Sequence, residues 1–475
     1  MERKDRYMKT ANVPQVGLLP FYLKLYDDIL PEARHGFDGF VKRIAAGLEA
    51  RGIGVQNAPI CRIKDEFAGA VRQFEKNGAD CIITLHLAYS PSMEAIEACC
   101  QTKLPIIILD TTMDSAFGLN VSPDKIMFNH GVHGVMDLAS MLRRRRCPFE
   151  IIAGHDSDPS LMERAANLAR AAFAARSMHG SHVLRIGDAF AGMGDFTVEE
   201  DVMAAKLGIQ VRQIGIDKLD EAVRKVTDAA VATEVAADHR SFACELPSEA
   251  HERSVRVGLG LRHILEKGSY SAMSINFQVF GRSDRPANTM PFLEISKAMA
   301  RGTGYAGEGD VLTAALVGAL ARAFGAVTFT EIFCADWAGG NLFLSHMGEI
   351  SPSVATGIPR VIVKPFFVGG SLDPSVLTCA VKPGPAVFVN LTPGPDDTFS
   401  LIVAPVEVLA EDASIDPAMR DIVRTWVRPR RKVAEFLEAY SRAGGTHHSA
   451  LVLGECAEAV AAFGRMLDVN VVEID

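Results

Sequence analysis

Acidic residues and histidines near strand ends and glycines, in the last third of the chain, are best placed to do chemistry. Glu331 lies in the otherwise uncharged segment VTFTEIF, where a charge is rare unless it is paired or bound to a metal. His346 and Glu349 follow a strand end in LSHMGEISPS. His447 and His448 follow two glycines in AGGTHHSALV, where the backbone can approach a ligand closely. Two carboxylates and one imidazole suit a divalent cation of borderline hardness such as Mn²⁺.

Each of these features also has a less specific interpretation. A glutamate in a strand can point to solvent, because strands commonly alternate buried and exposed faces. A pair of histidines in a loop can be an ordinary polar turn. Spacing along the chain does not show that Glu331, Glu349 and His448 converge, so the residues alone leave both interpretations open.

The first 150 residues alternate short apolar strands with helices, a pattern typical of βαβ units and a parallel sheet covered on both faces. Ligands collect beyond the C-terminal ends of such strands. The predicted strands are Val16–Phe21, Ile53–Gln56, Cys81–His86 and Pro105–Asp110, and the predicted helices are Phe37–Ala50, Phe67–Lys76 and Met93–Cys100. The segments beyond three of the strand ends are Tyr22–Tyr26, His86–Pro91 and Thr111–Asp114.

Two further regions follow. The central region is again α/β, with strands Phe149–Ala153, His182–Ile186 and Ile209–Ile214 and helices Met162–Met178, Leu219–Val235 and Val311–Phe324. The C-terminal region has short apolar strands separated by turns, which favours an antiparallel sheet or barrel. Its predicted elements are Val327–Phe333, Asn341–Ser345, Arg360–Phe367, Ala386–Leu391, Phe399–Val406, the helix Cys456–Leu467 and Val469–Ile474. We therefore expect two parallel-sheet, Rossmann-like α/β domains (1–150 and 151–325) and a barrel-like β-rich domain (326–475) that carries the metal site.

Composition excludes several classes of protein. A net charge of −9 without a basic lobe gives little support to nucleic-acid binding. The chain has no signal-peptide pattern and no run of about 20 apolar residues, so we expect a cytoplasmic protein without a membrane partner. The nine cysteines are scattered and odd in number, which predicts reduced thiols rather than a disulfide framework.

Five segments resemble the L-arabinose isomerase family, in the family's order and over about two thirds of the chain. GYAGEGD with the following TAAL is similar to its Gly-Phe-Ala-Gly-Glu-Gly-Asp segment, and FTEIF with SHMGEISPS to its Met-Glu and His-Met-x-Glu-x-x-Pro-Ser segments. GGTHHS resembles its Gly-Gly-Ala-His-His-Thr turn, RIGDAFAGMGDFTV its Arg-Phe-Gly-Asp element, and FNHGVHGVMD its Asn-Gln-Thr-Ala-His-Gly-Gly element.

The resemblance implies the same three-domain fold and a set of residue roles. Glu331 and Glu349 match the two metal-binding glutamates that take part in proton transfer, and His448 matches a metal-binding histidine. His133 matches the histidine that a neighbouring subunit contributes to the substrate site, which implies a homo-oligomer, hexamer or trimer, with active sites at subunit interfaces. Tyr89 occupies a sugar-facing position.

Departures from the family leave the substrate open. The family's further metal-binding histidine is absent, because the matching stretch VIVKPFFVGG has Lys364 or Pro365 at that place. A site with only Glu, Glu and His is closer to the three-ligand pattern of L-fucose isomerase. The family's glutamine near the first strand end is also missing, and Leu18–Tyr22 stands there. We place Tyr22, His447 and Lys364 with the substrate-binding residues. Lys364 either faces an acidic group on the sugar or points to solvent.

These observations predict a metal-dependent aldose–ketose isomerase acting on a sugar through an enediol, with Glu331 and Glu349 as acid and base. Two carboxylates near one cation suit this reaction because their surroundings can separate their pKa values. Two alternatives stay open: a sugar-binding or regulatory protein without catalysis, and a metal-dependent sugar epimerase.

Overall fold

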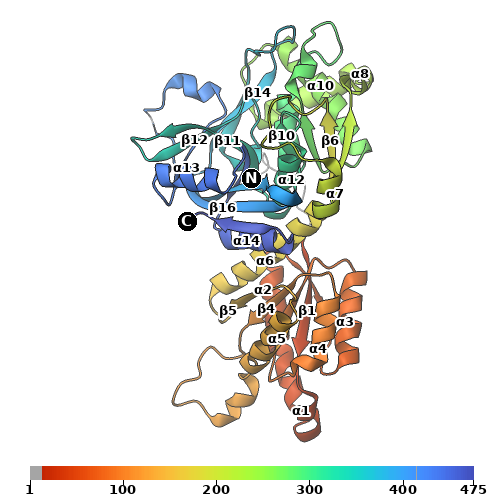
Figure 1. The fold of residues 1–475 in the computed structure, drawn as a ribbon, viewed down its shortest axis with the longest axis vertical. Coiled ribbons are helices and arrows are strands. Elements are labelled where there is room, and N and C mark those ends of the chain that lie inside the picture. The colour runs from red at the N-terminus through yellow and green to blue at the C-terminus, as the bar shows by residue number, and fades with distance from the viewer. Residues whose placement is uncertain (1–12, 413) are drawn as a thin grey trace. The chain divides into compact units, whose positions relative to one another are not determined.

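The computed structural model describes residues 13–412 and 414–475, which divide into two compact units. Of the described residues, 13–176 form the N-terminal unit and those from Ser177 to Asp475 form the second unit (Figure 1). The three-domain division at residues 150 and 325 stays a prediction. None of the helices in the described ranges is long and apolar enough to cross a membrane.

A five-stranded parallel sheet of order β2-β1-β3-β4-β5 forms the centre of the N-terminal unit, as expected. Every residue of β3 is buried, which requires cover on both faces of the sheet. Its strands are β1 (Gln15–Phe21), β2 (Gly54–Asn57), β3 (Cys81–His86), β4 (Ile106–Asp110) and β5 (Phe149–Ala153). Its helices are α1 (Lys24–Ile29), α2 (Asp38–Glu49), α3 (Lys64–Lys76), α4 (Ser92–Gln101), α5 (Val132–Arg144) and α6 (Pro159–His179), with 3₁₀ turns η1 (Ala33–Phe37) and η2 (Pro123–Phe128).

Two sequence-based expectations are wrong in this part of the chain. The strand Phe149–Ala153 was expected in the central region, but it pairs with β4 as the edge strand of the first sheet. The cysteines were all expected to be reduced, but Cys100 and Cys147 form a disulfide, with Cα atoms 5.6 Å apart. They are 47 residues apart in the sequence, and α4 and α5 pack in the same core cluster, which spacing alone could not show.

The second unit begins with a four-stranded parallel sheet of order β10-β9-β6-β7. Helix α12 packs so closely on it that a Cβ added at Gly304 would lie 2.4 Å from the backbone nitrogen of Gly318. The strands are β6 (His182–Ile186), β7 (Gln210–Ile214), β9 (Ala272–Ile275) and β10 (Gly304–Gly307). The helices are α7 (Glu200–Leu207), α8 (Ile216–Val223), α9 (Asp228–Ser241), α10 (Ser248–Lys267), α11 (Phe292–Ala300) and α12 (Val311–Phe324), with η3 (Phe277–Phe280).

The single helix expected over Leu219–Val235 is two helices, α8 and α9. Thr227 separates them, because its hydroxyl accepts a hydrogen bond from the amide of Ala230 and so caps the start of α9. Helical periodicity continued across this break, so the pattern alone did not reveal it.

A closed β-barrel completes the second unit, as the barrel-like expectation predicted. Its strands follow the order β15-β18-β11-β12-β17-β16, the β15–β16 pairing closes the ring, and β19 joins β16 in parallel. These strands are β11 (Val327–Asp336), β12 (Asn341–Ser345), β15 (Gly384–Pro393), β16 (Phe399–Val408), β17 (Thr425–Pro429), β18 (His448–Leu453) and β19 (Asn470–Glu473). A separate small sheet contains β8 (Ala243–Cys244), β13 (Ala355–Val363) and β14 (Ser375–Val381). The remaining elements are α13 (Val433–Arg442), α14 (Ala457–Met466), η4 (Pro352–Val354), η5 (Pro395–Asp397) and η6 (Pro417–Asp421).

A buried network of charges joins α9, α10 and α11. Lys297 Nζ lies 2.9 Å from Asp238 Oδ1 and 2.7 Å from Glu234 Oε1, and the Lys297 side chain is 2% exposed. Arg262 donates to both Glu234 and Glu294 at 2.6 Å. Buried charges persist only when they are paired, so this network is a condition for packing the three helices.

The network predicts a specific loss of stability in acid. Burial alone would raise the pKa of Glu234, but Arg262 and Lys297 outweigh burial and lower it to about 2. Because the unfolded value is about 4.3, this carboxylate stabilises the fold fully above that pH and loses its contribution as pH falls toward 2. Glu234→Gln should therefore flatten the fall in unfolding free energy between about pH 4.5 and 2. Urea unfolding at a series of pH values measures this, with the exposed Glu438→Gln as control; equal slopes in both variants would contradict it.

Candidate metal and catalytic site

The barrel register places Glu331 directly opposite His448. Glu331 on β11 pairs with His448 on β18 and, on its other side, with Ser345 on β12. Opposed residues in antiparallel strands have Cβ atoms roughly 5 Å apart, so their side chains can meet. The β11–β12 pairing shifts register between Ile332 and Cys334, immediately after this position. Bulges of this kind are common beside functional sites because they redirect side chains.

Two imidazoles approach the same oxygen of Glu331. His346, the residue after β12, places Nε2 3.0 Å from Glu331 Oε1, and His448 places Nε2 3.1 Å from that oxygen. Phe329 lies against both rings, with centroids 4.8 Å from His346 and 5.0 Å from His448. Phe196 stacks on His448 at 5.2 Å. One ligand atom from each of Glu331, His346 and His448 lies within 4.8 Å of the other two.

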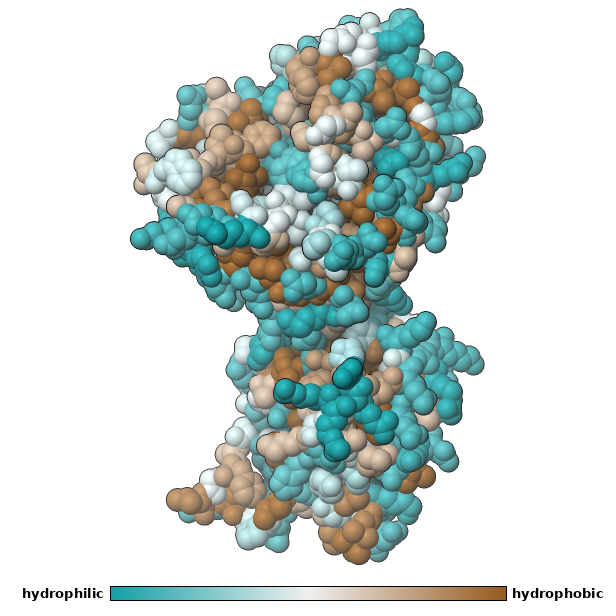
Figure 2. Space-filling view, viewed as in Figure 1, coloured by the Kyte–Doolittle hydropathy of each residue, from teal (hydrophilic) through white to brown (hydrophobic). Residues whose placement is uncertain are grey.

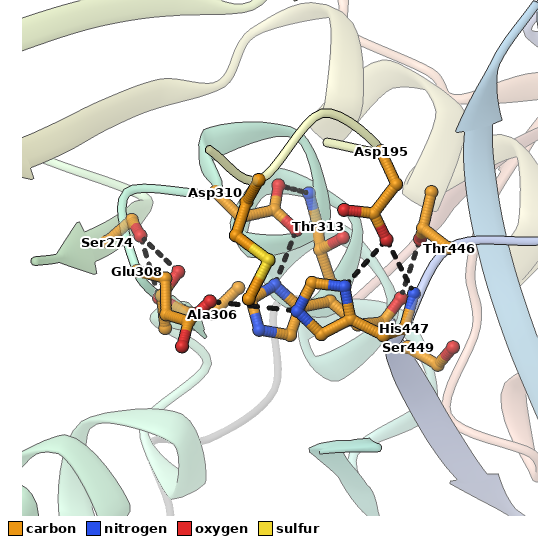
Figure 3. Close-up of polar contacts among 12 residues, drawn as sticks. Asp195, Ser274, Ala306, Glu308, Asp310, Thr313, Thr446, His447 and Ser449 are labelled. Atoms are coloured by element: carbon orange, nitrogen blue, oxygen red, sulfur yellow. Dashed lines mark hydrogen bonds and ion pairs between the residues drawn. The ribbon is translucent and has the colours of Figure 1, made fainter. Parts of the chain in front are cut away.

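Carboxylates hold the other nitrogen of each ring. Glu349 Oε1 lies 2.7 Å from His346 Nδ1, and Asp310 Oδ2 lies 2.9 Å from His448 Nδ1. Asp310 also caps α12, because Oδ1 accepts a hydrogen bond from the amide of Thr313 at 2.9 Å (Figure 3). Both rings are therefore fixed in orientation, with their Nε2 atoms directed at Glu331.

Glu349 reaches this cluster through His346. Its side chain is fully buried, and its second oxygen accepts the amide of Gly348 at 2.8 Å. Burial and Glu349 together raise the pKa of the Tyr305 hydroxyl well above its usual value. Of the predicted ligands, Glu331 and His448 meet directly, and the ligand role of Glu349 stays a prediction.

The cluster is strongly charged. Burial would raise the pKa of Glu331, but His346 and His448 outweigh it and lower the value to about 2. Burial would lower the pKa of His346, but Glu349 and Glu331 raise it to about 10. The pKa of His448 is also raised, by Asp310 and Glu331 against the effect of burial. Glu331 is thus held as a carboxylate in a site from which most water is excluded.

His447 belongs to a neighbouring polar group. Its Nδ1 lies 2.6 Å from Asp195 Oδ2, and its backbone amide donates to the same oxygen at 3.0 Å (Figure 3). Its Nε2 lies 3.6 Å from Glu308 Oε2, and Asp195 and Glu308 outweigh burial and raise the pKa of His447 to about 9. Glu308, His447 and His448 form a second group of donors within 4.8 Å of one another.

Side-chain hydrogen bonds hold the turn that carries His447 and His448. Asn390 donates to the carbonyl of His448 at 2.7 Å and accepts the amide of Thr446 at 3.2 Å. Tyr440 donates to the carbonyl of Thr446 at 2.5 Å. The sequence predicted that the backbone of this segment can approach a ligand closely. Its conformation depends on these side-chain hydrogen bonds as well as on its glycines.

A small pocket opens beside the cluster. Its wall is mostly aromatic and apolar, with a few polar groups, which is typical of small-molecule sites. The lining residues are Ile275, Phe277, Met290, Phe292, Tyr305, Gly307, Glu308, His346, Met347, Phe366 and Phe367.

Lys364 lies beside this wall and is partly buried. Its Nζ donates to the carbonyl of Met347 at 3.3 Å, and burial lowers its pKa while Glu349 raises it. Its proposed contact with an acidic sugar stays a prediction.

Three predicted substrate residues lie in the N-terminal unit, in one aromatic cluster. Tyr22 packs against Tyr26 at 5.8 Å, and Tyr26 Oη lies 3.0 Å from His130 Nε2. His133 contacts His130 at 6.0 Å and Tyr89 at 6.5 Å between ring centroids. Tyr22 is completely buried, whereas His133 is exposed at the start of α5. Tyr22 and Tyr89 follow the C-terminal ends of β1 and β3, where the sequence predicted ligand contacts.

Sequence reasoning left several residues of the site unassigned. Asp310 and Glu308 stand in the GYAGEGD segment, and Asp195 in RIGDAFAGMGDFTV. These three acidic residues therefore lie within segments that resemble the family, and that position could have identified them. His346 was noted near a strand end, but nothing in the sequence showed that its ring turns toward Glu331.

Asp310 gives a prediction that separates its two roles. Asp310→Asn keeps a good cap for α12 but removes the carboxylate behind His448, so it should weaken Mn²⁺ binding about 10- to 100-fold with little loss of stability. Asp310→Ala should also lower the unfolding free energy by about 1 kcal/mol. Calorimetric Mn²⁺ titration and urea unfolding measure both effects. Unchanged Mn²⁺ affinity in both variants would contradict the orienting role.

Comparisons with known proteins agree over most of the chain. The sequence profile of the L-arabinose isomerase central domain matches residues 182–324, and that of the C-terminal domain matches residues 326–470. The L-arabinose isomerase of Nocardioides sp. is 29% identical over 401 residues, covering 82% of this chain and 78% of that protein. That of Herpetosiphon aurantiacus is 28% identical over 454 residues, covering 91% and 88%.

Among solved structures, the periplasmic binding protein component of an arabinose ABC transporter from Shewanella sp. is 14% identical and covers 64% of this chain and 82% of that chain. Its TM-score of 0.15 is too low to support an argument.

Fold and site together define the class: an α/β protein whose C-terminal barrel buries histidines and carboxylates suited to a divalent cation. The two profiles together match well over half of the residues. The chain therefore belongs to the L-arabinose isomerase family, a family of aldose–ketose isomerases.

Proposed function

We propose that this protein is a metal-dependent isomerase that interconverts an aldose and a ketose through an enediol. The observation that carries the proposal is the convergence of His346 Nε2 and His448 Nε2 on one oxygen of Glu331, beside a small pocket with a largely aromatic and apolar wall. Relatives named L-arabinose isomerase over 78–88% of their own length support the reaction class.

The residues at this point fit a divalent cation. His448 Nε2 is buried and has no hydrogen-bond partner of good geometry within the described ranges. Gly307 keeps the space in front of both rings open, because a Cβ there would lie 3.4 Å from His346 Nε2 and 3.8 Å from His448 Nε2. Imidazole nitrogen with carboxylate oxygen suits Mn²⁺. The proposed ligands include Glu331 and His448, with Glu349 as the further ligand implied by the family resemblance.

The chain's own residues supply positioning and proton transfer. When bound, a divalent cation polarises the sugar carbonyl as a Lewis acid. Glu331, kept ionised beside two histidines, is able to take up a proton from the carbon next to the carbonyl. Glu349 accepts a hydrogen bond from His346. It is the second carboxylate, beside Glu331, that proton transfer between the sugar oxygens requires. The aromatic wall around Phe277 and Phe366 excludes water from the enediol.

We also propose that the protein works as a homo-oligomer in the cytoplasm, with His133 serving a neighbouring subunit's site. The N-terminal unit that carries His133 also exposes large apolar residues, and Figure 2 shows hydrophobic residues on the surface of this unit. They are Leu25, Ile29, Phe117, Leu119 and Ile126. Burial of such residues against a neighbouring subunit would remove apolar surface from water.

Product analysis across a panel of sugars tests the proposal. Aldopentoses, deoxyhexoses and acidic hexoses are incubated with the full chain and Mn²⁺, and the products are separated. We expect a ketose from at least one aldose. An epimeric aldose would favour the epimerase, and tight binding without any conversion would favour the sugar-binding protein. Activity confined to neutral sugars would contradict the role proposed for Lys364.

A further inference from the structure

A third group of metal-donor side chains lies in the second unit, on elements that carry none of the residues around Glu331. It consists of His239 in the last turn of α9, Cys244 on β8 and His251 in the first turn of α10. One ring nitrogen of each histidine and the Cys244 Sγ lie within 4.8 Å of one another. The group contains no carboxylate, so ion pairing among its members does not account for it.

We infer that His239, Cys244 and His251 bind a divalent cation of the Zn²⁺ class, at a site separate from the proposed isomerase site. Thiolate sulfur with imidazole nitrogen is a donor set that suits Zn²⁺, whereas carboxylate oxygen with imidazole nitrogen suits Mn²⁺. Donors around a tetrahedral Zn²⁺ are roughly 3.5 Å apart. Atoms that already lie within 4.8 Å of one another therefore reach such an ion through small side-chain rotations.

Asp238 holds His251 in the orientation of a metal ligand. Asp238 Oδ2 lies 3.0 Å from His251 Nε2, and both side chains are buried. Because this carboxylate pairs with Lys297 and acts as an acceptor, Nε2 carries a proton and the neutral ring presents its lone pair at Nδ1. A carboxylate on the outer nitrogen is the usual partner of a zinc-binding histidine. His251 thus has the hydrogen bond that a ligand histidine needs.

The surrounding charges favour a cation at this point. The positive charge of Lys297 is balanced by Asp238 at 2.9 Å and Glu234 at 2.7 Å. His239 lies at the C-terminal end of α9, where the helix carries a partial negative charge. Burial, and after it Asp238, raises the pKa of the Cys244 thiol to about 11. The sulfur is therefore no activated nucleophile at neutral pH, and a bound cation is what would convert it to a thiolate.

An ion held by these residues would join three elements of the second unit. Helices α9 and α10 already share the buried charge network, and β8 pairs in parallel with β13, with Cys244 opposite Val361. Because the donors come together only in the folded chain, binding stabilises that state. With Mn²⁺ saturating, we expect Zn²⁺ to shift the urea midpoint upward in the wild type and by less in Cys244→Ser.

Co²⁺, a spectroscopic substitute for Zn²⁺, tests the inference. Thiolate bound to Co²⁺ gives a charge-transfer band in the near ultraviolet, and among the three donor groups of the described residues only this one contains a cysteine. The full chain is titrated with Co²⁺ alone. We expect the band in the wild type and its loss in Cys244→Ser. In His239→Gln we expect the Co²⁺ affinity that the band reports to fall at least about tenfold.

The choice of variants separates metal binding from unfolding. His239 is exposed, so His239→Gln removes a ligand without opening the core. Cys334→Ser is the matched control, because Cys334 is a free, exposed cysteine outside the group, and it should keep the band. A wild type without the band at saturating Co²⁺ would overturn the inference. So would a band that is unchanged in Cys244→Ser or an affinity that is unchanged in His239→Gln.

Discussion

Glu331→Gln is expected to abolish isomerisation while leaving the fold intact. The substitution keeps the size of the side chain but removes the charge that both histidines face at 3.0 and 3.1 Å. It takes away the proposed base and a proposed cation ligand together, and general acid–base catalysis alone contributes about 10²- to 10⁴-fold. We therefore expect ketose formation to fall by at least about 10³-fold.

A matched control makes this result specific. Glu407 stands on the same barrel, on β16, with an exposed side chain, so Glu407→Gln changes the same chemical group away from the site. Ketose formation is measured at saturating Mn²⁺, and circular dichroism confirms folding of both variants. Near-normal turnover by Glu331→Gln would show that Glu331 is not the catalytic carboxylate.

Lys297→Met is expected to destabilise the fold strongly. Lys297 is 2% exposed and pairs with Glu234 and Asp238, and the Asp238 side chain is completely buried. Removing one partner of a buried ion pair leaves an uncompensated charge and costs about 3–5 kcal/mol. Urea unfolding measures this loss in unfolding free energy.

Lys218→Met provides the comparison, because Lys218 pairs with Glu221 on the surface, with side chains 62% and 51% exposed. Exposed pairs contribute about 0–1 kcal/mol, so this variant should unfold almost like the wild type. Equal stability of the two lysine variants would contradict the structural role given to the network.

Segments with a strong local signal could be predicted from the sequence with their bounds. The strands Cys81–His86, His182–Ile186 and Asn341–Ser345 and the helix Val311–Phe324 have the same bounds in the structure. Each is a short apolar run or a regular helical pattern, so local preference and tertiary packing agree.

Features that depend on pairing between distant segments could not be predicted. His448 was expected in a turn, but it begins β18 and lies opposite Glu331 only because β18 pairs with β11, although the two residues are far apart in the sequence. The edge position of β5 and the Cys100–Cys147 disulfide likewise follow from packing. No local pattern encodes such pairings.

The candidate site was predictable in its chemistry but not in its geometry. Charge in an apolar strand identified Glu331, two preceding glycines drew attention to His448, and family resemblance implied its metal-binding role. The orientation of His346 depends on the buried carboxylate of Glu349 and the ring of Phe329, which only the folded barrel brings together.

Isomerisation in D₂O, with metal-stripped and Mn²⁺-reconstituted protein, tests the central claim most directly. The reaction is run with an aldose that the protein converts, and nuclear magnetic resonance measures the deuterium content of the ketose product. We expect ketose only after Mn²⁺ is restored, with solvent deuterium at C1, because an enediol exchanges its proton through a carboxylate. Ketose formed equally without metal, or no ketose from any aldose, would contradict the account.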